Sequence, residues 1–336
     1  MKNFQSSFFT ALVVGAASIL ATGTAPADQI FVSDNGNNSI EQISENGSSP
    51  GTLSPFVPST SNLSGPTGLA FYGDNLFVAN NALSGGGSGF VAEFSQATGA
   101  FEGDYATGLN SPRGLVFDSF GNMYVANQMG GTITEVPAGG GPAQTIVTGL
   151  PYANALTFGS DGNLYVTNGN AGSSGNNIEK VTLTDGVVNS VSTFVNSGLI
   201  DPIGITYDST GPNAGNFFVV NDQNSVLEFN SLGAAVPPTP FISDLNASDR
   251  QDDITVDSAG NIYVTDNGDE TVTEYSSSGA ILNVYSGEAV NGACYITASF
   301  STDPVPEPST YVLLTAGLGV LFFASRRNRK VATVRL

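Results

Sequence analysis

The sequence predicts an all-β fold: a six-bladed β-propeller closed by its N- and C-terminal strands, with an N-terminal signal peptide and a C-terminal transmembrane helix. Three features of the 336 residues predict it: one short apolar motif recurs six times, partial repeat units stand at both ends of the array, and export signals flank the array. The expected domains are a signal peptide at 1–27, the propeller at 28–302 and a sorting tail at 303–336, with a transmembrane helix at about 310–325.

The repeated motif is an apolar residue, an aromatic residue and valine. Its six copies begin at Ile30, Leu76, Met123, Leu164, Phe217 and Ile262. Successive copies start 46, 47, 41, 53 and 45 residues apart, and Asn or Asp always stands two residues after the valine. Sequence periods of about 20–50 residues are typical of solenoids and propellers.

Each repeat unit contains four short segments that read as strands. A Gly-apolar segment such as Gly114–Phe117 precedes the motif and is joined to it by a turn such as 118–122, where glycine supplies the positive φ of a tight hairpin. An alternating segment such as Thr132–Val136 follows, and then a weaker one such as Gln144–Val147. The period is two residues rather than 3.6, which excludes a helical solenoid. Four antiparallel strands make one propeller blade.

The two ends of the array complement each other. The N-terminal unit has three strands, expected at Gln29–Asp34, Ser39–Ile43 and Leu53–Val57, and lacks the first. Tyr295–Phe300 supplies a first strand with nothing after it. Pairing of these ends would complete a sixth blade and remove the open sheet edges that invite aggregation.

Two columns of the repeat have structural roles. The aromatic residues are expected to fill the space between stacked blades. The Asn/Asp column, formed by Asp34, Asn80, Asn127, Asn168, Asn221 and Asp266, is expected to cap turns through hydrogen bonds from side chain to backbone.

The segments outside the array read as export signals. Lys2, the apolar stretch 8–21 and Ala25-Pro26-Ala27 have the three zones of a secretory signal peptide, with cleavage expected before Asp28. At the other end an apolar run is followed at once by a basic stop, which holds the positive charges on the cytoplasmic side. The stop consists of Arg326, Arg327, Arg329 and Lys330. The run is short for a bilayer, which favours a temporary anchor.

Charge excludes two classes of partner. Between positions 28 and 305 there are 28 acidic residues against three basic ones (Arg113, Lys180 and Arg250), a net charge of about −25. Nucleic acids and anionic lipid surfaces bind clustered Lys and Arg, so neither is an expected partner.

The tail resembles the PEP-CTERM sorting signal of Gram-negative bacteria, whose Pro-Glu-Pro matches Pro306, Glu307 and Pro308. That resemblance implies processing by an exosortase, transient anchoring in the inner membrane, and then display at the cell surface or release. The repeats resemble NHL repeats and the regucalcin/gluconolactonase and streptogramin-lyase propellers over about residues 29–300, most clearly at Asp257–Asp266. This superfold hosts enzymes, scaffolds and binding proteins alike.

The residue inventory excludes several chemistries. There is no histidine, so a Ser-His-Asp triad, a His-ligated zinc site and a histidine general base are impossible. Streptogramin lyases depend on histidine, so that activity is not expected. Cys294 is the only cysteine, so no internal disulfide forms, and a buried position on the closing strand is expected.

The start of the innermost strands is where propeller enzymes hold their ligands, and this column supplies the ligand-binding candidates. It contains Thr67, Arg113, Asn154, Ile203, Asp252 and Cys294. Resemblance to gluconolactonases implies that Asn154 and Asp252 are metal ligands. The match is incomplete, because Ala155 and Asp253 replace glycine and Arg113 brings a cation to the channel. Asp252 and Asp253 would point to opposite faces of a regular strand.

A second candidate cation site is the acidic loop after the last motif, with Asp266, Asp269 and Glu270. Clustered oxygens suit calcium, but the spacing of an EF-hand is absent. No cofactor is expected apart from a possible divalent cation.

These observations favour an exported, non-catalytic propeller that binds a glycan or protein, or serves as a scaffold, at the cell surface or in an exopolysaccharide matrix. The variable loops 80–89 and 169–177 are candidate contact sites. The alternative is a divalent-metal-dependent lactonase that uses Asn154 and Asp252.

Overall fold

Antiparallel β-sheets make up the chain as far as the structure describes it. The computed structural model describes residues 28–44, 52–59, 62–82, 88–169, 176–184, 186–221, 225–243, 245, 251–286 and 292–299. These ranges contain 23 strands and no helix. Accordingly, no helix long and apolar enough to cross a membrane is found within them. The predicted signal peptide, sorting motif and helix at 310–325 lie outside the described residues.

The strands are arranged as consecutive antiparallel meanders. The first complete one contains β4 (Pro66–Tyr72), β5 (Asn75–Asn80), β6 (Gly89–Ser95) and β7 (Phe101–Leu109). The next contains β8 (Pro112–Phe117), β9 (Met123–Asn127), β10 (Thr132–Val136) and β11 (Gln144–Thr148). The third contains β12 (Ala153–Phe158), β13 (Leu164–Asn168), β14 (Asn177–Thr184) and β15 (Val187–Val195). These bounds agree with the expected strands to within one or two residues.

The remaining strands form a three-stranded and an eight-stranded sheet. The three-stranded sheet contains β16 (Pro202–Tyr207), β17 (Phe217–Asn221) and β18 (Ser225–Phe229). Four strands of the larger sheet are β19 (Gln251–Val256), β20 (Ile262–Asp266), β21 (Thr271–Tyr275) and β22 (Ile281–Ser286). The other four are β3 (Thr52–Val57), β2 (Ser39–Ser44), β1 (Gln29–Asp34) and β23 (Ala293–Ser299).

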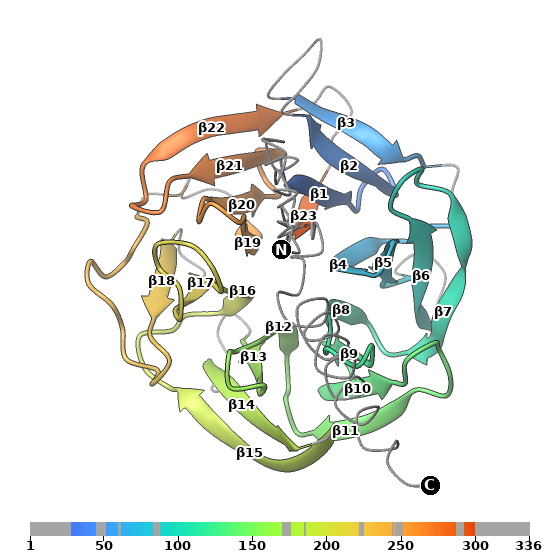
Figure 1. Cartoon of the computed structure of the whole chain (residues 1–336), viewed down its shortest axis with the longest axis horizontal. Helices are drawn as coiled ribbons and strands as arrows, with labels where there is room; N and C mark the ends of the chain where they lie inside the picture. The colour runs from blue at the N-terminus through green and yellow to red at the C-terminus, as the bar shows by residue number, and fades with distance from the viewer. Residues whose placement is uncertain are drawn as a thin grey trace, which may run out of the picture. The chain divides into compact units, whose positions relative to one another are not determined.

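The predicted pairing of the chain's two ends is confirmed. Strand β1 pairs antiparallel with β23, in a register that places Gln29 opposite Ser299 and Phe31 opposite Thr297. Figure 1 shows the sheets arranged in a ring, with β4, β8, β12, β16, β19 and β23 nearest its centre. All of these strands belong to one compact unit, Ala27–Thr302.

Two details differ from the expected six sheets of four strands. The described strands form five sheets, because one parallel residue pair, Ser286 with Thr52, joins β22 to β3. The sheet of β16–β18 has no fourth strand in the described ranges; the chain there makes only isolated bridges, Val226–Ile242 and Phe229–Ala235. Three prolines fall between these bridges, at 237, 238 and 240, and proline donates no hydrogen bond to a sheet.

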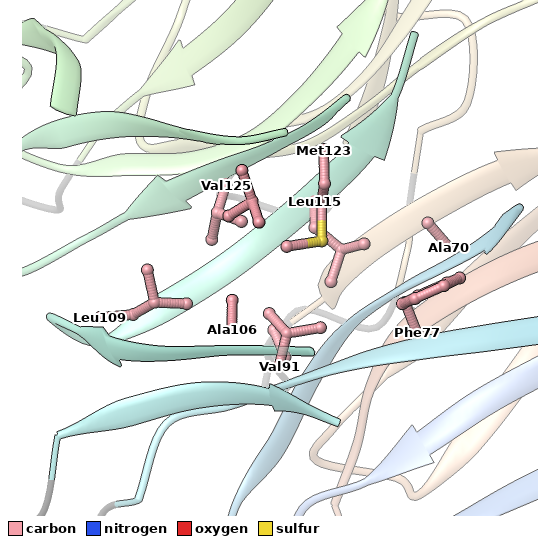
Figure 2. Close-up of a cluster of buried hydrophobic side chains, with 10 residues drawn as sticks. Ala70, Phe77, Val91, Ala106, Leu109, Leu115, Met123 and Val125 are labelled. Carbon is pink, nitrogen blue, oxygen red and sulfur yellow. The ribbon is translucent and has the colours of Figure 1, made fainter. Parts of the chain in front are cut away.

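The hydrophobic core lies between neighbouring sheets. Six clusters of buried side chains follow one another around the ring. In the cluster of Figure 2, Phe77 and Val91 from one sheet meet Leu115, Met123 and Val125 from the next. The predicted role of the aromatic column is confirmed, since Phe31, Phe77, Tyr124, Tyr165, Phe218 and Tyr263 are all buried.

The Asn/Asp column caps turns, as expected, but in two different ways. The four asparagines accept N–H groups from the loop that precedes the same sheet's inner strand: Ser64 to Asn80 (2.8 Å), Asn110 to Asn127 (3.3 Å), Tyr152 to Asn168 (2.9 Å) and Ile200 to Asn221 (2.7 Å). The two aspartates instead cap the turn that follows them, Asp34 through Asn37 N (2.9 Å) and Asp266 through Gly268 N (3.0 Å). The asparagines therefore fix the loops from which the inner strands begin.

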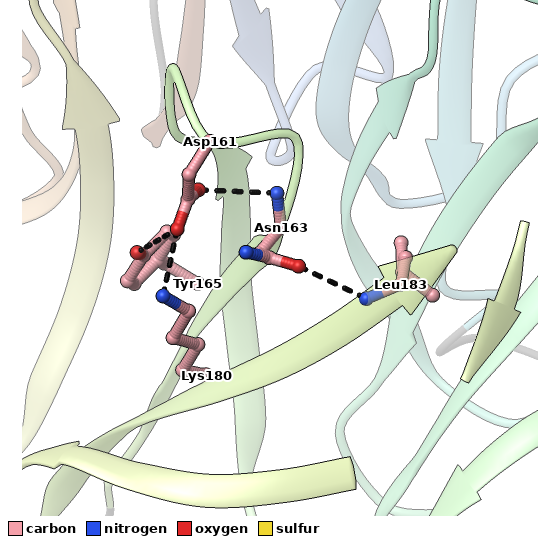
Figure 3. A network of polar contacts seen from close by, with 5 residues as sticks. All are labelled: Asp161, Asn163, Tyr165, Lys180 and Leu183. Carbon is pink, nitrogen blue, oxygen red and sulfur yellow. Dashed lines mark hydrogen bonds and ion pairs between the residues drawn. The ribbon is translucent and has the colours of Figure 1, made fainter. Parts of the chain in front are cut away.

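The hairpin turns between first and second strands are held by aspartate. Asp118 accepts the N–H groups of Phe120 (2.8 Å) and Asn122 (2.9 Å), and Gly121 has the predicted positive φ of 88°. In the corresponding turn of Figure 3, Asp161 accepts from Lys180 Nζ (2.7 Å) and Tyr165 Oη (2.9 Å). Partial burial alone would raise the pKa of Asp161, but the hydrogen bonds to its carboxylate have the larger effect and lower the pKa to about 2.

A column of glutamates, buried at Glu228 and Glu274 and half-buried at Glu93 and Glu135, is a feature that the sequence reasoning missed. Glu93, Glu135, Glu228 and Glu274 stand directly opposite the central aromatic residue of the neighbouring strand. Glu228, which is 4% exposed, accepts the Asn216 Nδ2 group at 2.7 Å. The signal was present as Glu recurring in the third strand of each unit, but charged residues on half-buried strands are ordinarily read as solvated.

We expect the Glu228→Gln variant to be more stable than the wild type at pH 8 and to lose that advantage at pH 4. Burial is the main cause that raises the pKa of Glu228, partly opposed by the hydrogen bond from Asn216. A raised folded-state pKa means that the native state holds its proton longer, so stability falls as pH rises through the folded pKa. Urea unfolding at both pH values measures this, with the exposed Glu102→Gln as control. Equal effects of both variants would contradict it.

Candidate functional site

The inner strands all begin with the same irregularity. In β4 the first and fourth residues pair with β5 residues only two apart, Pro66 with Asn80 and Leu69 with Val78. The same shift occurs in β8, β12, β16 and β19, so each of these strands carries one extra residue at its start. Such a β-bulge re-aims side chains and is frequent beside functional sites.

The bulge in β19 removes the reason for expecting Asp252 and Asp253 to point to opposite faces. The expectation that Asp252 and Asp253 point to opposite faces assumed a regular strand, and the register of β19 shifts between Gln251 and Ile254. The Asp252 side chain itself lies outside the described residues. Asp253 is 8% exposed, and its Oδ2 accepts the N–H of Ile296 in β23 at 3.2 Å.

Small residues allow the inner strands to approach closely at this level. A Cβ on Gly68 would overlap the Arg113 carbonyl oxygen of the next inner strand, and one on Gly114 would lie 2.8 Å from Ala155 Cα. A Cβ on Gly204 would lie 2.7 Å from Asp253 Cα. Glycine at positions 68, 114 and 204 is thus explained by the packing of backbone on backbone around the channel.

Thr67 and Asn154 act as ties between neighbouring sheets. Thr67 Oγ1 lies 2.9 Å from the carbonyl oxygen of Pro112 in β8 and is buried. Asn154 Nδ2 donates to the carbonyl oxygens of Gly169 (3.0 Å) and Pro202 (3.1 Å), the latter in β16. These contacts give both residues a structural role.

Arg113 lies across the start of the channel. Its Nη1 donates to Asn154 Oδ1 at 3.3 Å, and its guanidinium carbon stands 5.9 Å from the centre of the Tyr295 ring. In the described part of the chain Arg113 Nε is buried without a hydrogen-bond partner, and no carboxylate forms an ion pair with the side chain. The structure therefore brings together three predicted site residues, because Thr67 also binds the strand that carries Arg113.

The hydrogen bonds of Asn154 disfavour the metal site that was expected there. Asn154 Oδ1, the atom that would ligate a metal, already accepts hydrogen bonds from Arg113 Nη1 and from Gln128 Nε2 at 2.9 Å. A cation there would displace both donors and lie beside a guanidinium. Ile203, between Asn154 and Asp252 in the column, is 2% exposed and its carbonyl oxygen accepts from Thr167 Oγ1.

The acidic loop forms a turn. Asp266 Oδ1 accepts the N–H groups of Gly268 and Asp269, both at 3.0 Å, and Glu270 has a φ of 58°. Across the described ranges no three His, Cys, Asp or Glu residues form a group suited to a metal ion. The structure describes the backbone of Cys294 but not its side chain. The other predicted residues, Pro306, Glu307, Pro308 and the basic stop, are not among the described residues.

We call the level of the channel that holds Thr67, Arg113 and Asn154 the Arg113 layer. Beside it the channel contains a cavity of about 690 Å³. Gly68, Gly114, Ala155, Asp253 and Tyr295 line its inner end, whereas Thr67, Arg113 and Asn154 do not line it. At the other end it reaches the turns after β4 and β8, at Asp74 and Ser119. The cavity thus occupies the channel from the Arg113 layer to the face where the inner strands end, a feature that no sequence pattern indicated.

The ring of radial sheets around a central channel defines the chain as a β-propeller. In a crystal structure of a nidogen/laminin complex, one chain superposes with a TM-score of 0.67 at 17% identity, over 82% of this chain and 99% of that one. A gluconolactonase from Xanthomonas campestris gives a TM-score of 0.55 at 19% identity, over 71% and 79% of the two chains. Regucalcin from Agrobacterium tumefaciens, a calcium-binding protein, gives 0.54 at 16% identity, over 68% and 76%.

These identities are low, so the likeness shows the fold alone. It confirms the expected similarity in fold to NHL, regucalcin and gluconolactonase propellers. A comparison with curated proteins finds no match in sequence.

The tail supplies the more particular assignment. Residues 304–330 match the PEP-CTERM protein-sorting motif, which confirms the expectation from Pro306, Glu307 and Pro308. The chain thus joins a β-propeller fold to a segment that matches this sorting motif. The motif indicates export with membrane-associated sorting in Gram-negative bacteria, and it implies processing by an exosortase-type enzyme.

Proposed function

We propose that this protein is an exported, non-catalytic β-propeller that serves as a binding or scaffold protein at the cell surface or in the exopolysaccharide matrix. The observation that carries the proposal is the joining of a PEP-CTERM tail to a β-propeller. In this proposal residues 1–27 are removed as a signal peptide, and a helix at about 310–325 with the basic stop holds the chain in the inner membrane until the tail is cleaved.

The propeller in this proposal has six blades. The eight-stranded sheet is counted as two, because a single residue pair joins its halves while a separate hydrophobic cluster packs between them. That cluster contains Ile30, Val32 and Ile296 from one half and Tyr263 and Tyr285 from the other. Six such clusters follow the ring, one for each interface between neighbouring blades.

The absence of catalysis is supported by the chemistry of the channel start. Histidine is lacking, Thr67 and Asn154 hydrogen-bond to backbone groups, and the charged side chain that contacts Asn154 is the cation Arg113. The alternative, a metal-dependent lactonase, would require Asn154 Oδ1 to exchange its two hydrogen-bond donors for a metal ion. Hydrolysis of a lactone panel that depends on added Ca²⁺ and is lost in Asn154→Ala would favour that alternative.

The processing step predicts a defined product. In the native host, material recovered from the cell surface or medium is expected to lack the basic stop, with a new C-terminus near Pro306, because a sorting enzyme cleaves at the motif. Mass spectrometry of the C-terminal peptide measures it. The Glu307→Ala variant serves as control and is expected to stay in the membrane fraction with its tail intact. Surface material that ends at Leu336 would contradict the proposal.

A further inference from the structure

Two hollows meet on the face where the inner strands end. One is the channel cavity of about 690 Å³. The other, of about 990 Å³, lies beside it over the strands β1 to β7. Tyr72, Gly73, Asp74 and Gln96 line both hollows, so the two adjoin. We call the combined hollow the Tyr72 cleft.

Aromatic surface is available in the Tyr72 cleft. The Tyr72 ring stacks on Phe117, with centroids 4.9 Å apart and planes 16° apart, while 41% of the residue remains exposed. The second hollow is also lined by Phe56, Phe77 and Tyr105. Aromatic rings that are apolar on the face and fixed by packing provide contact area at low entropic cost.

The charged groups of the cleft are carboxylates, which act only as hydrogen-bond acceptors. Asn75 Nδ2 donates to Glu93 Oε1 (2.6 Å) and Glu102 Oε2 (3.1 Å), which leaves one oxygen of each carboxylate without a partner among the described residues. The Asp74 carboxylate, at the junction of the two hollows, makes no hydrogen bond in the same ranges, although its backbone oxygen accepts Gln96 N at 2.9 Å. Carboxylates only accept, so they suit a ligand rich in hydroxyl donors.

Charge excludes an anionic ligand. The lining includes Asp74, Asp118, Asp253, Glu93 and Glu102 and, within the described part of the chain, neither Lys nor Arg. The Asp118 carboxylate already accepts hydrogen bonds from the backbone N–H groups of Phe120 and Asn122 in its own turn. A negatively charged ligand would enter against these carboxylates and against the overall charge of about −25 between positions 28 and 305.

We propose that the Tyr72 cleft binds a neutral polysaccharide chain. Hydroxyl groups of the sugar donate to Asp74, Glu93 and Glu102, and a sugar ring packs on the exposed face of Tyr72. Each hollow has the size of a small-molecule site, so the two together hold several sugar residues of one chain. This inference rests on the proposed binding function and gives it a face of the propeller, opposite the Arg113 layer, and a ligand class.

The test is calorimetric titration of the full chain, held in a detergent without sugar headgroups. The probes are neutral hexasaccharides of β-glucan, α-glucan, mannan and galactan, together with anionic hexagalacturonate and cationic chitosan hexamer. We expect at least one neutral probe to bind and hexagalacturonate to give no signal. Tyr72→Ala is expected to weaken neutral binding about tenfold through loss of the ring contact. Asp74→Ala, in an exposed turn away from the stack, is expected to weaken it about threefold through loss of one acceptor.

The matched control is Tyr152→Ala, an aromatic residue of similar exposure at 36% that precedes an inner strand on the other face. Its binding is expected to equal that of the wild type. Loss of binding in Tyr152→Ala but not in the Tyr72 and Asp74 variants would overturn the cleft while leaving a binding function in place. Silence of all neutral probes, or preference for the chitosan hexamer, would overturn the ligand class; export would still be tested by the mature C-terminus.

Discussion

Replacing Phe31 with alanine is expected to lower the free energy of unfolding by about 3–5 kcal/mol, the cost of emptying a fully buried aromatic site. Phe31 stands on β1 and is 0% exposed, and its ring contacts Phe56 (centroids 4.7 Å apart) and Phe71 of the neighbouring sheet (5.1 Å). Urea unfolding monitored by circular dichroism measures the loss.

The control for this prediction is Phe120→Ala. Phe120 is 72% exposed in a hairpin turn, so its loss is expected to change stability by less than about 0.5 kcal/mol. If Phe31→Ala cost no more than Phe120→Ala, β1 would not be packed in the ring in solution. Closure of the chain by β1 and β23 would then be wrong.

The Gly68→Ala variant is expected to lose about 3 kcal/mol of stability through overpacking. The added methyl group would overlap the Arg113 carbonyl oxygen, a backbone atom of the adjacent inner strand that cannot swing aside. Because the overlap pushes β4 away from β8, the hydrogen bond from Thr67 Oγ1 to the Pro112 carbonyl oxygen should lengthen as well.

Gly73→Ala separates this clash from the general cost of replacing glycine. Gly73 has a φ of +61° with nothing within 4 Å of an added Cβ, so the variant should lose only about 1 kcal/mol from left-handed backbone strain. Thermal unfolding of the two variants gives the comparison. A Gly68→Ala protein as stable as Gly73→Ala would show that the inner strands have room at their start.

The repeated parts of the fold could be predicted because their causes are local. The apolar-aromatic-valine motif has the period of a strand, and Asp and Gly at fixed offsets define the hairpin that precedes it; both act over a few residues. Strands such as β10 were therefore placed at their observed bounds. The sheet of β16–β18 was harder, because prolines at 237, 238 and 240 interrupt the segment that pairs with β18, which in the described ranges forms two isolated bridges with it.

The candidate site was predicted only in part. Comparison of the repeats within the chain predicts Thr67, Arg113 and Asn154 at one level of the channel, but their partners come from other strands. The Asn154 side chain, for example, bonds to groups 15 to 48 residues away, Gly169 and Pro202 among them. A residue's type gives its capacity to bind a metal or a backbone group, and the choice between the two depends on those distant partners.

The sequence by itself determined that the chain is a β-propeller with a PEP-CTERM tail, since hydrophobic period, turn residues and a contiguous motif are all encoded locally. Only the tertiary structure decided which end of the channel is hollow and what surrounds it. The Arg113 layer and the Tyr72 cleft are formed by side chains from several sheets. Their positions follow from ring closure and bulged strand starts, which depend on contacts between residues far apart in the chain.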